Sequence, residues 1–107
     1  MPSTERLYMF GQKKSDPRPD YEYFTIYDSK SESYREPMLA INEHDMVRQI
    51  SNLFADPAQA QNQLLLNAED FSLFSVGFFS KKTGSIESHA PRHIANLHEI
   101  RTASKLN

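Results

Sequence analysis

Cysteine is absent from this 107-residue sequence, and glycine occurs only three times, as Gly11, Gly77 and Gly84. The lack of cysteine excludes a disulfide framework and a thiolate zinc site, and it fits a reducing compartment. None of the glycines stands in the spacing of a phosphate-binding P-loop. The longest apolar runs fall far short of the roughly 20 residues of a membrane-spanning helix, and residues 1–11 lack the apolar stretch of a signal peptide. We therefore expect neither a secreted nor a membrane-spanning protein.

A large excess of charge of one sign is also missing. The sequence has 12 Lys and Arg residues against 14 Asp and Glu residues, a formal net charge of −2. The molecule as a whole would not attract nucleic acid, so any such binding would have to use a local basic patch. A chain of this length suits one domain with a modest core.

The chain divides into an N-terminal extension and one domain. Residues 12–20, QKKSDPRPD, contain two prolines, five charged residues and no apolar side chain. This composition cannot be buried and is typical of a linker or arm. We therefore assign residues 1–20 to an N-terminal extension and linker, and residues 21–107 to a single domain.

The first half of this domain predicts a hairpin and then a helix. YEYFTIYD (residues 21–28) has the aromatic and β-branched residues of a strand, and after the turn SKSES extended structure resumes at YREPMLAI, where Pro37 indicates an edge or a bulge. Asn42 and Asp56-Pro57 then bound an apolar stripe at helical spacing, formed by Met46, Val47, Ile50, Leu53 and Phe54. A short second helical turn is expected within residues 58–68.

The second half predicts another hairpin and a C-terminal helix. FSLFSVGFF (residues 71–79) carries apolar side chains on both faces, which is typical of a central strand covered on each side. SKKTGS then predicts a turn, SIESH its partner strand, and Pro91 the start of a final helix. The expected fold class is α+β: an antiparallel sheet built from two β-hairpins, with a central amphipathic helix and a C-terminal helix.

Signals for catalysis are few. Lys82-Thr83-Gly84 matches one element of the serine β-lactamase signature, but the chain has no Ser-x-x-Lys partner for it. The four histidines do not share a helical face and are more typical of surface positions than of a metal site. The acidic pairs look like helix-start and turn residues, with no sign of a pocket. We expect no enzymatic activity, no cofactor and no metal.

Basic residues interleaved with aromatic ones favour nucleic-acid binding, because single-strand binders stack bases on rings and hold phosphates with cations. The candidate nucleic-acid-binding residues lie on the arm and on the two hairpin turns: Lys13, Lys14, Arg18, Tyr27, Lys30, Tyr34, Arg35, Lys81 and Lys82. Two alternatives stay open. Charged turns and strand tyrosines are also ordinary features of solvated hairpins, and an edge strand or the leucines at residues 64–66 could bind a partner protein.

Three segments carry a resemblance to a known family: FTIYDSKSESYREPM, the helix end NLFADP, and NAEDFSLFSVGFFSKKTGSI. Together they resemble the small nonstructural protein of gokushoviruses, Microviridae phages with circular single-stranded DNA genomes. The resemblance covers roughly residues 23–90. The matching positions are Tyr27, Asp28, Lys30, Tyr34, Pro37, Asp56, Pro57, Glu69, Asp70, Phe71, Leu73, Phe74, Gly77, Phe79, Thr83 and Gly84.

Two features depart from the family pattern. The turn that contains Lys81 and Lys82 is basic, whereas the corresponding turn is often acidic in the family. Residues 1–20 extend beyond the position at which members of the family commonly start. The resemblance implies a non-capsid bacteriophage protein of the host bacterial cytoplasm, regarded as a DNA-binding or genome-packaging accessory. It implies no catalytic residues, and a family alone does not establish an activity.

The residues and the resemblance together predict a non-enzymatic accessory protein for single-stranded DNA replication or genome packaging, which binds DNA. The alternative is an adaptor that binds the phage replication protein or the procapsid without contacting DNA. The expected partners are single-stranded DNA and one of these phage components, with no membrane. A strand that is apolar on both faces, with few helices to cover it, also favours a homo-oligomer.

Overall fold

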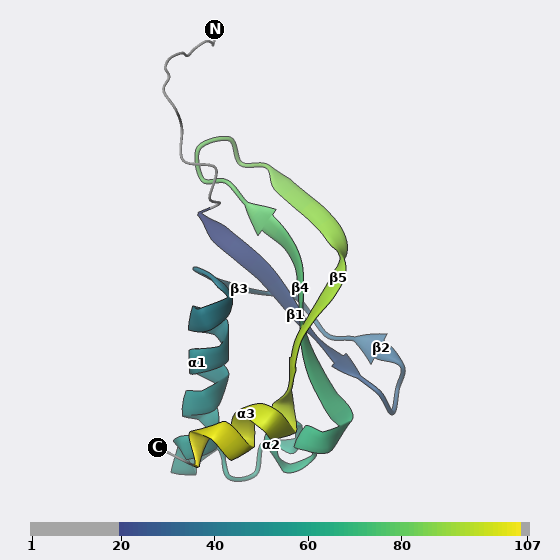
Figure 1. Cartoon of the computed structure of the whole chain (residues 1–107), viewed down its shortest axis with the longest axis vertical. Coiled ribbons are helices and arrows are strands. Elements are labelled where there is room, and N and C mark those ends of the chain that lie inside the picture. Colours follow the sequence, from purple (N-terminus) through teal and green to yellow (C-terminus); the bar gives the residue numbers. More distant parts are fainter. Residues whose placement is uncertain (1–19, 106–107) are drawn as a thin grey trace, which may run out of the picture.

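The computed structural model describes residues 20–105. Figure 1 shows a sheet with helices packed against it. The expected α+β fold is confirmed, with two β-hairpins, a central helix and a C-terminal helix. The elements in chain order are β1 (Tyr21–Asp28), β2 (Ser33–Tyr34), β3 (Met38–Ala40), α1 (Glu43–Ala55), the 3₁₀ helix η1 (Pro57–Gln59), α2 (Gln63–Leu66), the 3₁₀ helix η2 (Ala68–Asp70), β4 (Phe71–Phe79), β5 (Ile86–Asn96) and α3 (Leu97–Ser104).

The five strands form one antiparallel sheet. β2 and β3 pair with the same edge of β1, and the order then continues through β4 to β5. Pro37 lies between β2 and β3, at the edge of the sheet, where a residue without a backbone N–H removes no ladder hydrogen bond. The position predicted for Pro37 is confirmed.

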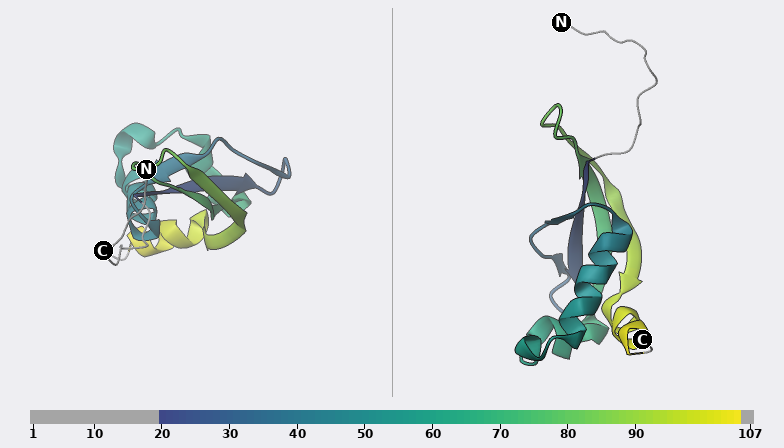
Figure 2. Two further views of the ribbon diagram at one scale, coloured as in Figure 1. Left: turned by 90° about the horizontal axis from the view of Figure 1, so that it is seen from above. Right: turned by 90° about the vertical axis from the view of Figure 1, so that its left-hand side faces the viewer.

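The helices cover one face of this sheet (Figure 1), and the right-hand view of Figure 2 looks onto α1 with the strands behind it. The core lies between them. It joins residues of β1, β3, β4, α1, η2 and α3: Phe24, Ile26, Ala40, Met46, Ile50, Ala68, Phe71, Leu73, Leu97 and Ile100.

The expectation that β4 is covered on both faces is wrong. Burial alternates along this strand, so that Phe71 and Leu73 are buried whereas Phe74 and Val76 on the other face are only half-buried. Both α1 and α3 pack on the same side, and the described chain has no further long helix for the opposite side. One face of the sheet is therefore open, and the pattern of apolar residues alone did not distinguish it from a second buried face.

α1 begins and ends where the sequence predicted. The Asn42 side chain accepts a hydrogen bond from the backbone N–H of Asp45 over 2.8 Å, and Asp56 follows the last helical residue. Met46 and Ile50 of the predicted stripe are buried, whereas Leu53 is half-buried at its margin. The short helical turn expected within residues 58–68 is confirmed as α2.

The C-terminal helix begins later than predicted, because Pro91 lies inside β5 and does not start a helix. Ser75 pairs with Arg92 and Gly77 with Ser88, so residues 89–91 lie in an irregularity of the ladder. A proline is tolerated at such a bulge because no ladder hydrogen bond is required there. α3 begins at Leu97, where Glu99 Oε1 accepts a hydrogen bond from the backbone N–H of Asn96 over 2.9 Å.

The two glycines of the second hairpin are required for different reasons. A Cβ atom on Gly77 would lie 2.6 Å from the backbone oxygen of Glu87, so β5 can approach β4 this closely only beside a glycine. Gly84 has a φ of +73° in the hairpin turn, a conformation that glycine adopts without steric cost. Its predicted role in closing the turn is confirmed.

The assigned N-terminal extension, apart from Asp20, lies outside the described residues. Between residues 20 and 105, no helix is long and apolar enough to cross a membrane.

Candidate nucleic-acid interface

Four rings lie next to one another on the open face of the sheet, and we call them the aromatic row: Tyr34, Tyr27, Phe74 and His93. The ring centroids of Tyr34 and Tyr27 are 4.8 Å apart, and those of Tyr34 and Phe74 are 5.6 Å apart. Phe74 also lies 5.4 Å from His93, edge to face. The register explains the row, since Tyr27 pairs with Tyr34 across β1 and β2, and Phe74 pairs with His93 across β4 and β5.

A polar group borders the row at the base of β5. Asn96 Oδ1 accepts a hydrogen bond from Ser72 Oγ over 2.7 Å, and His93 Nε2 lies 3.0 Å from the same oxygen. These contacts fix the orientation of the His93 ring beside Phe74. The row therefore combines flat apolar surfaces with a polar margin, which is the arrangement that nucleobases require for stacking and hydrogen bonding.

Lys30 and Arg35 lie at the same end of the sheet as the row. Lys30 belongs to the turn after β1, and Arg35 follows β2. The backbone N–H of Lys30 donates to Asp28 Oδ1 over 2.9 Å, and this bond lowers the pKa of Asp28 below its ordinary value of 3.8, with a smaller contribution from the charge of Arg35. Within residues 20–105, neither Lys30 nor Arg35 forms an ion pair.

Lys81 and Lys82 lie at the opposite end, in the turn between β4 and β5 (Figure 1). The Lys81 Nζ atom lies 5.6 Å from the centre of the Tyr21 ring. The backbone N–H of Lys81 donates a hydrogen bond to Asp20 Oδ2 over 2.7 Å. The candidate cations thus form two groups instead of one patch. Lys13, Lys14 and Arg18 lie outside the described residues.

An apolar pocket of about 360 Å³ lies between the two basic ends. Its lining residues come from the middle of β1 and β4, from the edge beside β3, and from β5: Tyr23, Pro37, Val76, Gly77, Ile86, Ser88 and His89. Sequence analysis did not assign any of these residues to a site.

The helix-covered face holds a different kind of cluster. Glu22 is buried, and its Oε2 atom accepts a hydrogen bond from Ser75 Oγ over 2.6 Å and lies 3.3 Å from Arg92 Nη2. Arg92 also pairs with Glu43 of α1 over 3.1 Å. The network ties β1, β4, β5 and the start of α1 together, and it occupies Arg92.

A serine, a histidine and a carboxylate meet in this network, but not in the arrangement of a nucleophilic triad. His89 Nε2 lies 3.2 Å from Ser75 Oγ, while its Nδ1 faces the backbone oxygen of Ala90 at 2.8 Å. In a triad the carboxylate orients the histidine, whereas here Glu22 contacts the serine itself, which is fully buried. The geometry supports a structural role. No group of three or more metal-ligating side chains occurs within the described part of the chain.

Phe74 and His93 are the members of the row that sequence analysis missed as site residues. Phe74 was assigned to the core, because a strand with apolar residues on both faces looks like a central one. The sequence showed that Phe74 and its neighbours point to alternate faces of the strand. It did not show which of the two faces would be open.

The protein-family comparison matches residues 21–100 to the Phage ORF5 protein. The chain belongs to this phage protein family. The match begins with β1 and reaches into α3, so it includes every strand of the sheet and the whole aromatic row. No curated protein and no solved structure matches the chain.

Proposed function

We propose that this Phage ORF5 protein is a non-enzymatic accessory factor for single-stranded DNA replication or genome packaging, and that it binds DNA on its open sheet face. The proposal places it among the nonstructural proteins of gokushoviruses, in the cytoplasm of the host bacterium. It rests on the family and on the resemblance carried by residues 23–90.

The observation that carries the binding proposal is the aromatic row beside Lys30 and Arg35, which form no ion pair with any other residue between 20 and 105. Tyr34 is 48% exposed although its ring contacts Tyr27 and Phe74. Solvent-facing aromatic groups on a sheet are the stacking platforms of single-strand binders, because every base has a face to stack on. Lys30 lies in the turn after β1 and Arg35 directly follows Tyr34, so both cations are placed beside the row where the phosphates of a stacked strand would lie.

Removal of one ring tests the proposal. Tyr34→Ala should weaken binding to a labelled oligothymidine by about 5- to 150-fold, the equivalent of one lost stack, as measured by fluorescence anisotropy at two salt concentrations. Leu66→Ala is the matched control, because Leu66 is 52% exposed but lies on α2, away from the row. Binding of Tyr34→Ala equal to wild type, or no binding by the wild-type protein at either salt concentration, would contradict the proposal.

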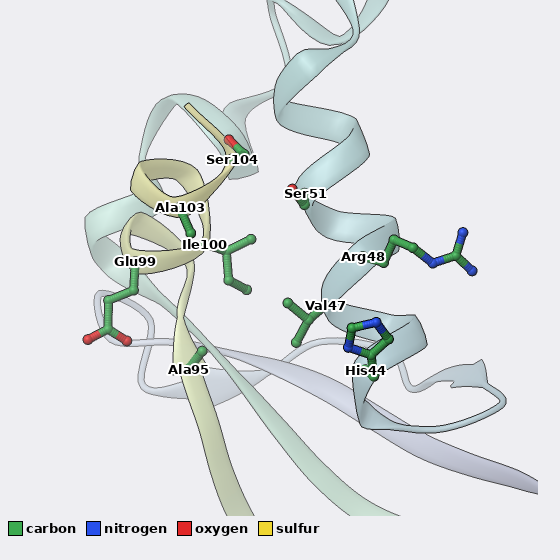
Figure 3. A pocket seen from close by; sticks show the side chains of 9 residues that line it. All are labelled: His44, Val47, Arg48, Ser51, Ala95, Glu99, Ile100, Ala103 and Ser104. Carbon is green, nitrogen blue, oxygen red and sulfur yellow. The ribbon is translucent and has the colours of Figure 1, made fainter. Parts of the chain in front are cut away.

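One observation favours the adaptor function as a second candidate. A groove of about 460 Å³ lies between α1 and α3 (Figure 3), with Val47, Ala95 and Ile100 in its apolar part and with Arg48 and Glu99 at its polar margin. Apolar grooves between helices can hold side chains of a partner protein. The formal net charge of −2 also suits a protein partner better than DNA.

A larger side chain in the groove tests this alternative. Ser51→Arg should obstruct the groove and abolish the complex with the purified phage replication protein or procapsid, as followed by size-exclusion chromatography with light scattering. Asn52→Arg adds the same group to the neighbouring residue of α1, which is exposed and does not line the groove. Equal behaviour of the two variants would argue against the adaptor function.

A further inference from the structure

We propose that one DNA strand lies lengthwise along the open face, from the hairpin tip with Lys81 and Lys82 to the end with Lys30 and Arg35, and that the apolar pocket between these ends accepts a base. This inference rests on the proposed function and adds to it the course of the strand, the length that is bound and a second base site.

The register of the sheet separates the two basic ends. Tyr21 pairs with Phe79, directly before the hairpin tip, whereas Asp28 pairs with Phe71, directly before the turn that holds Lys30. The seven strand steps between Tyr21 and Asp28 correspond to about 23 Å at ~3.3 Å per residue. A strand that contacts both ends must therefore cover the whole length of the sheet.

The surface between the ends carries several aromatic rings, with the polar residues Thr25 and Ser72 among them. Alternate residues of β1 point to the same face. Glu22, Phe24 and Ile26 are buried on the helix side, and the tyrosines of β1 therefore point to the open face. The Tyr21 ring lies 6.5 Å from Phe79 near the tip, and Tyr23 lines the pocket in the middle. At the far end Tyr27 belongs to the aromatic row.

The pocket has the form of a base site. Val76 and Ile86 give it apolar walls, and Ser88 gives it a hydroxyl group, whereas both ring nitrogens of His89 already face Ser75 and Ala90. Gly77, which has no side chain, also lines the pocket. A base needs flat apolar contact and a few hydrogen-bonding groups at its edge, and this pocket provides both.

The charges fit a strand that is held at its two ends. Within the described strands β1, β4 and β5, Arg92 is the only Lys or Arg, and it bonds to Glu22 and Glu43 on the helix-covered face. The middle of the open face therefore offers stacking without phosphate contacts. Lys81 and Lys82 at one end, and Lys30 and Arg35 at the other, supply cations for the phosphates, and Lys30 and Arg35 share their segment with the carboxylates of Asp28, Glu32 and Glu36.

A length series of oligothymidines tests the course of the strand. A path of about 23 Å corresponds to about four to six nucleotides, at the lower end of the site sizes of single-strand binders. The association constant, measured by anisotropy or by NMR titration for the weaker oligomers, should rise steeply up to this length and little beyond it.

Charge reversal at the tip sharpens the test. The double variant Lys81→Glu/Lys82→Glu should make the negative slope of log K against log salt shallower by about 1.4 for oligomers longer than the footprint, since each lost contact to a single strand contributes about 0.7. Dinucleotides reach only one end, and their binding at the aromatic row should not change. Tyr34→Ala should weaken both the short and the long oligomers.

The pocket has a matched pair of variants. Ile86 and Ile41 are both 62% exposed, but only Ile86 lines the pocket. Ile86→Ala should weaken the binding of long oligomers severalfold and leave dinucleotides unaffected, whereas Ile41→Ala should change neither. Equal effects of the two variants on the binding of long oligomers would contradict the proposal that the pocket accepts a base.

Three results would overturn the inference. Binding that stops rising at two or three nucleotides, with no effect of the tip variant, would leave DNA binding at the row intact but contradict the lengthwise course. No binding to any oligomer would overturn the proposed function together with this inference. A concentration-dependent dimer that Ile86→Ala and Tyr34→Ala dissociate, with DNA affinity unchanged, would identify the open face as an interface between two copies of the chain.

Discussion

Leu73 and Phe74 are neighbours in β4, yet they belong to two different surfaces. Leu73 is fully buried beneath the helices, in contact with the core of the domain. Phe74 is half-buried on the open face, where its ring contacts Tyr34, Tyr27 and His93. The two residues are similarly apolar, so the difference between them comes from what packs on each side of the sheet.

This comparison shows that an apolar residue of a strand can contribute to the core or to an exposed surface, depending on the face of the sheet to which its side chain points. The side chains under the helices gain free energy by leaving water on folding. The rings of the aromatic row gain less of it, because they stay partly exposed, and in our proposal they form the binding surface. Variants that act on one face should therefore change stability, and variants on the other should change binding.

The largest expected difference comes from truncation of the two neighbours. Leu73→Ala should lower the free energy of unfolding by about 2–5 kcal/mol, because it leaves a cavity in the core. Phe74→Ala should cost less, since its ring is half-buried and no helix covers it. Chemical denaturation of both variants measures the difference. Equal costs would mean that the open face is covered in solution.

A methyl group on each glycine of the second hairpin tests the close approach of β4 and β5. Gly77→Ala should destabilise the protein by about 1–3 kcal/mol, because the backbone of β5 must shift to admit the new Cβ atom. Gly84→Ala meets no atom within 4 Å, and its cost should be about 1–2 kcal/mol from the positive φ alone. Amide hydrogen exchange should show the Gly77→Ala effect across β5 and the Gly84→Ala effect only at the turn.

Two serines of β4 compare the hydrogen bonds of the two faces. Ser75→Ala should cost about 1–3 kcal/mol, because it removes a bond to the buried carboxylate of Glu22. Ser72→Ala breaks the bond to Asn96 on the open face, where water can replace it, and should cost about 0.5–1.5 kcal/mol. Thermal melts of both variants decide the order. A reversed order would show that the Glu22 network contributes little to folding.

The smallest expected effect is on the stability of the protein at acidic pH. The pKa of Asp45 is lowered from its ordinary value of 3.8, first by the hydrogen bond from the backbone N–H of Ile41 and then by the Arg48 side chain. The stability that this carboxylate adds is therefore present above pH 3.8 and is lost as the pH falls through the lowered pKa.

Asp45→Asn should flatten the dependence of unfolding on pH in this acidic window and leave that dependence unchanged near neutrality. Asp45 lies at the start of α1, so the effect should appear in the helix. Asp28, whose pKa is also lowered, provides the comparison at the turn beside the aromatic row. An unchanged acid profile of Asp45→Asn would contradict the assignment.

Local features of the fold could be predicted because short-range physics sets them. Asn42 and Asp56-Pro57 bound α1, since a side-chain acceptor and a proline act on the neighbouring backbone. The strands, the turn at Gly84 and the edge position of Pro37 followed from similar local rules. Pro91 misled the prediction of the last helix, because a proline fits a bulge in a strand as well as the first turn of a helix.

The candidate site was predicted only in parts. Tyr27, Tyr34, Lys30 and Arg35 were identified by residue type, and the structure brings them to one end of the sheet. Lys81 and Lys82 were assigned with them but lie at the other end of the sheet. The turn that holds them follows the last residue of β4, whereas the aromatic row lies near the first residues of this strand. His93 could not be placed at all, because its contact with Phe74 depends on the register of β5 after the bulge.

The sequence by itself determined the order of the elements, the cap and end of α1, and the two hairpins, because each depends on residues close together in the chain. Only the tertiary structure decided which face of the sheet is covered and which aromatic residues meet on the open one. The physical reason is that β4 offers apolar residues to both sides, and that the packing of α1 and α3, not the composition of the strand, selects the side that leaves water.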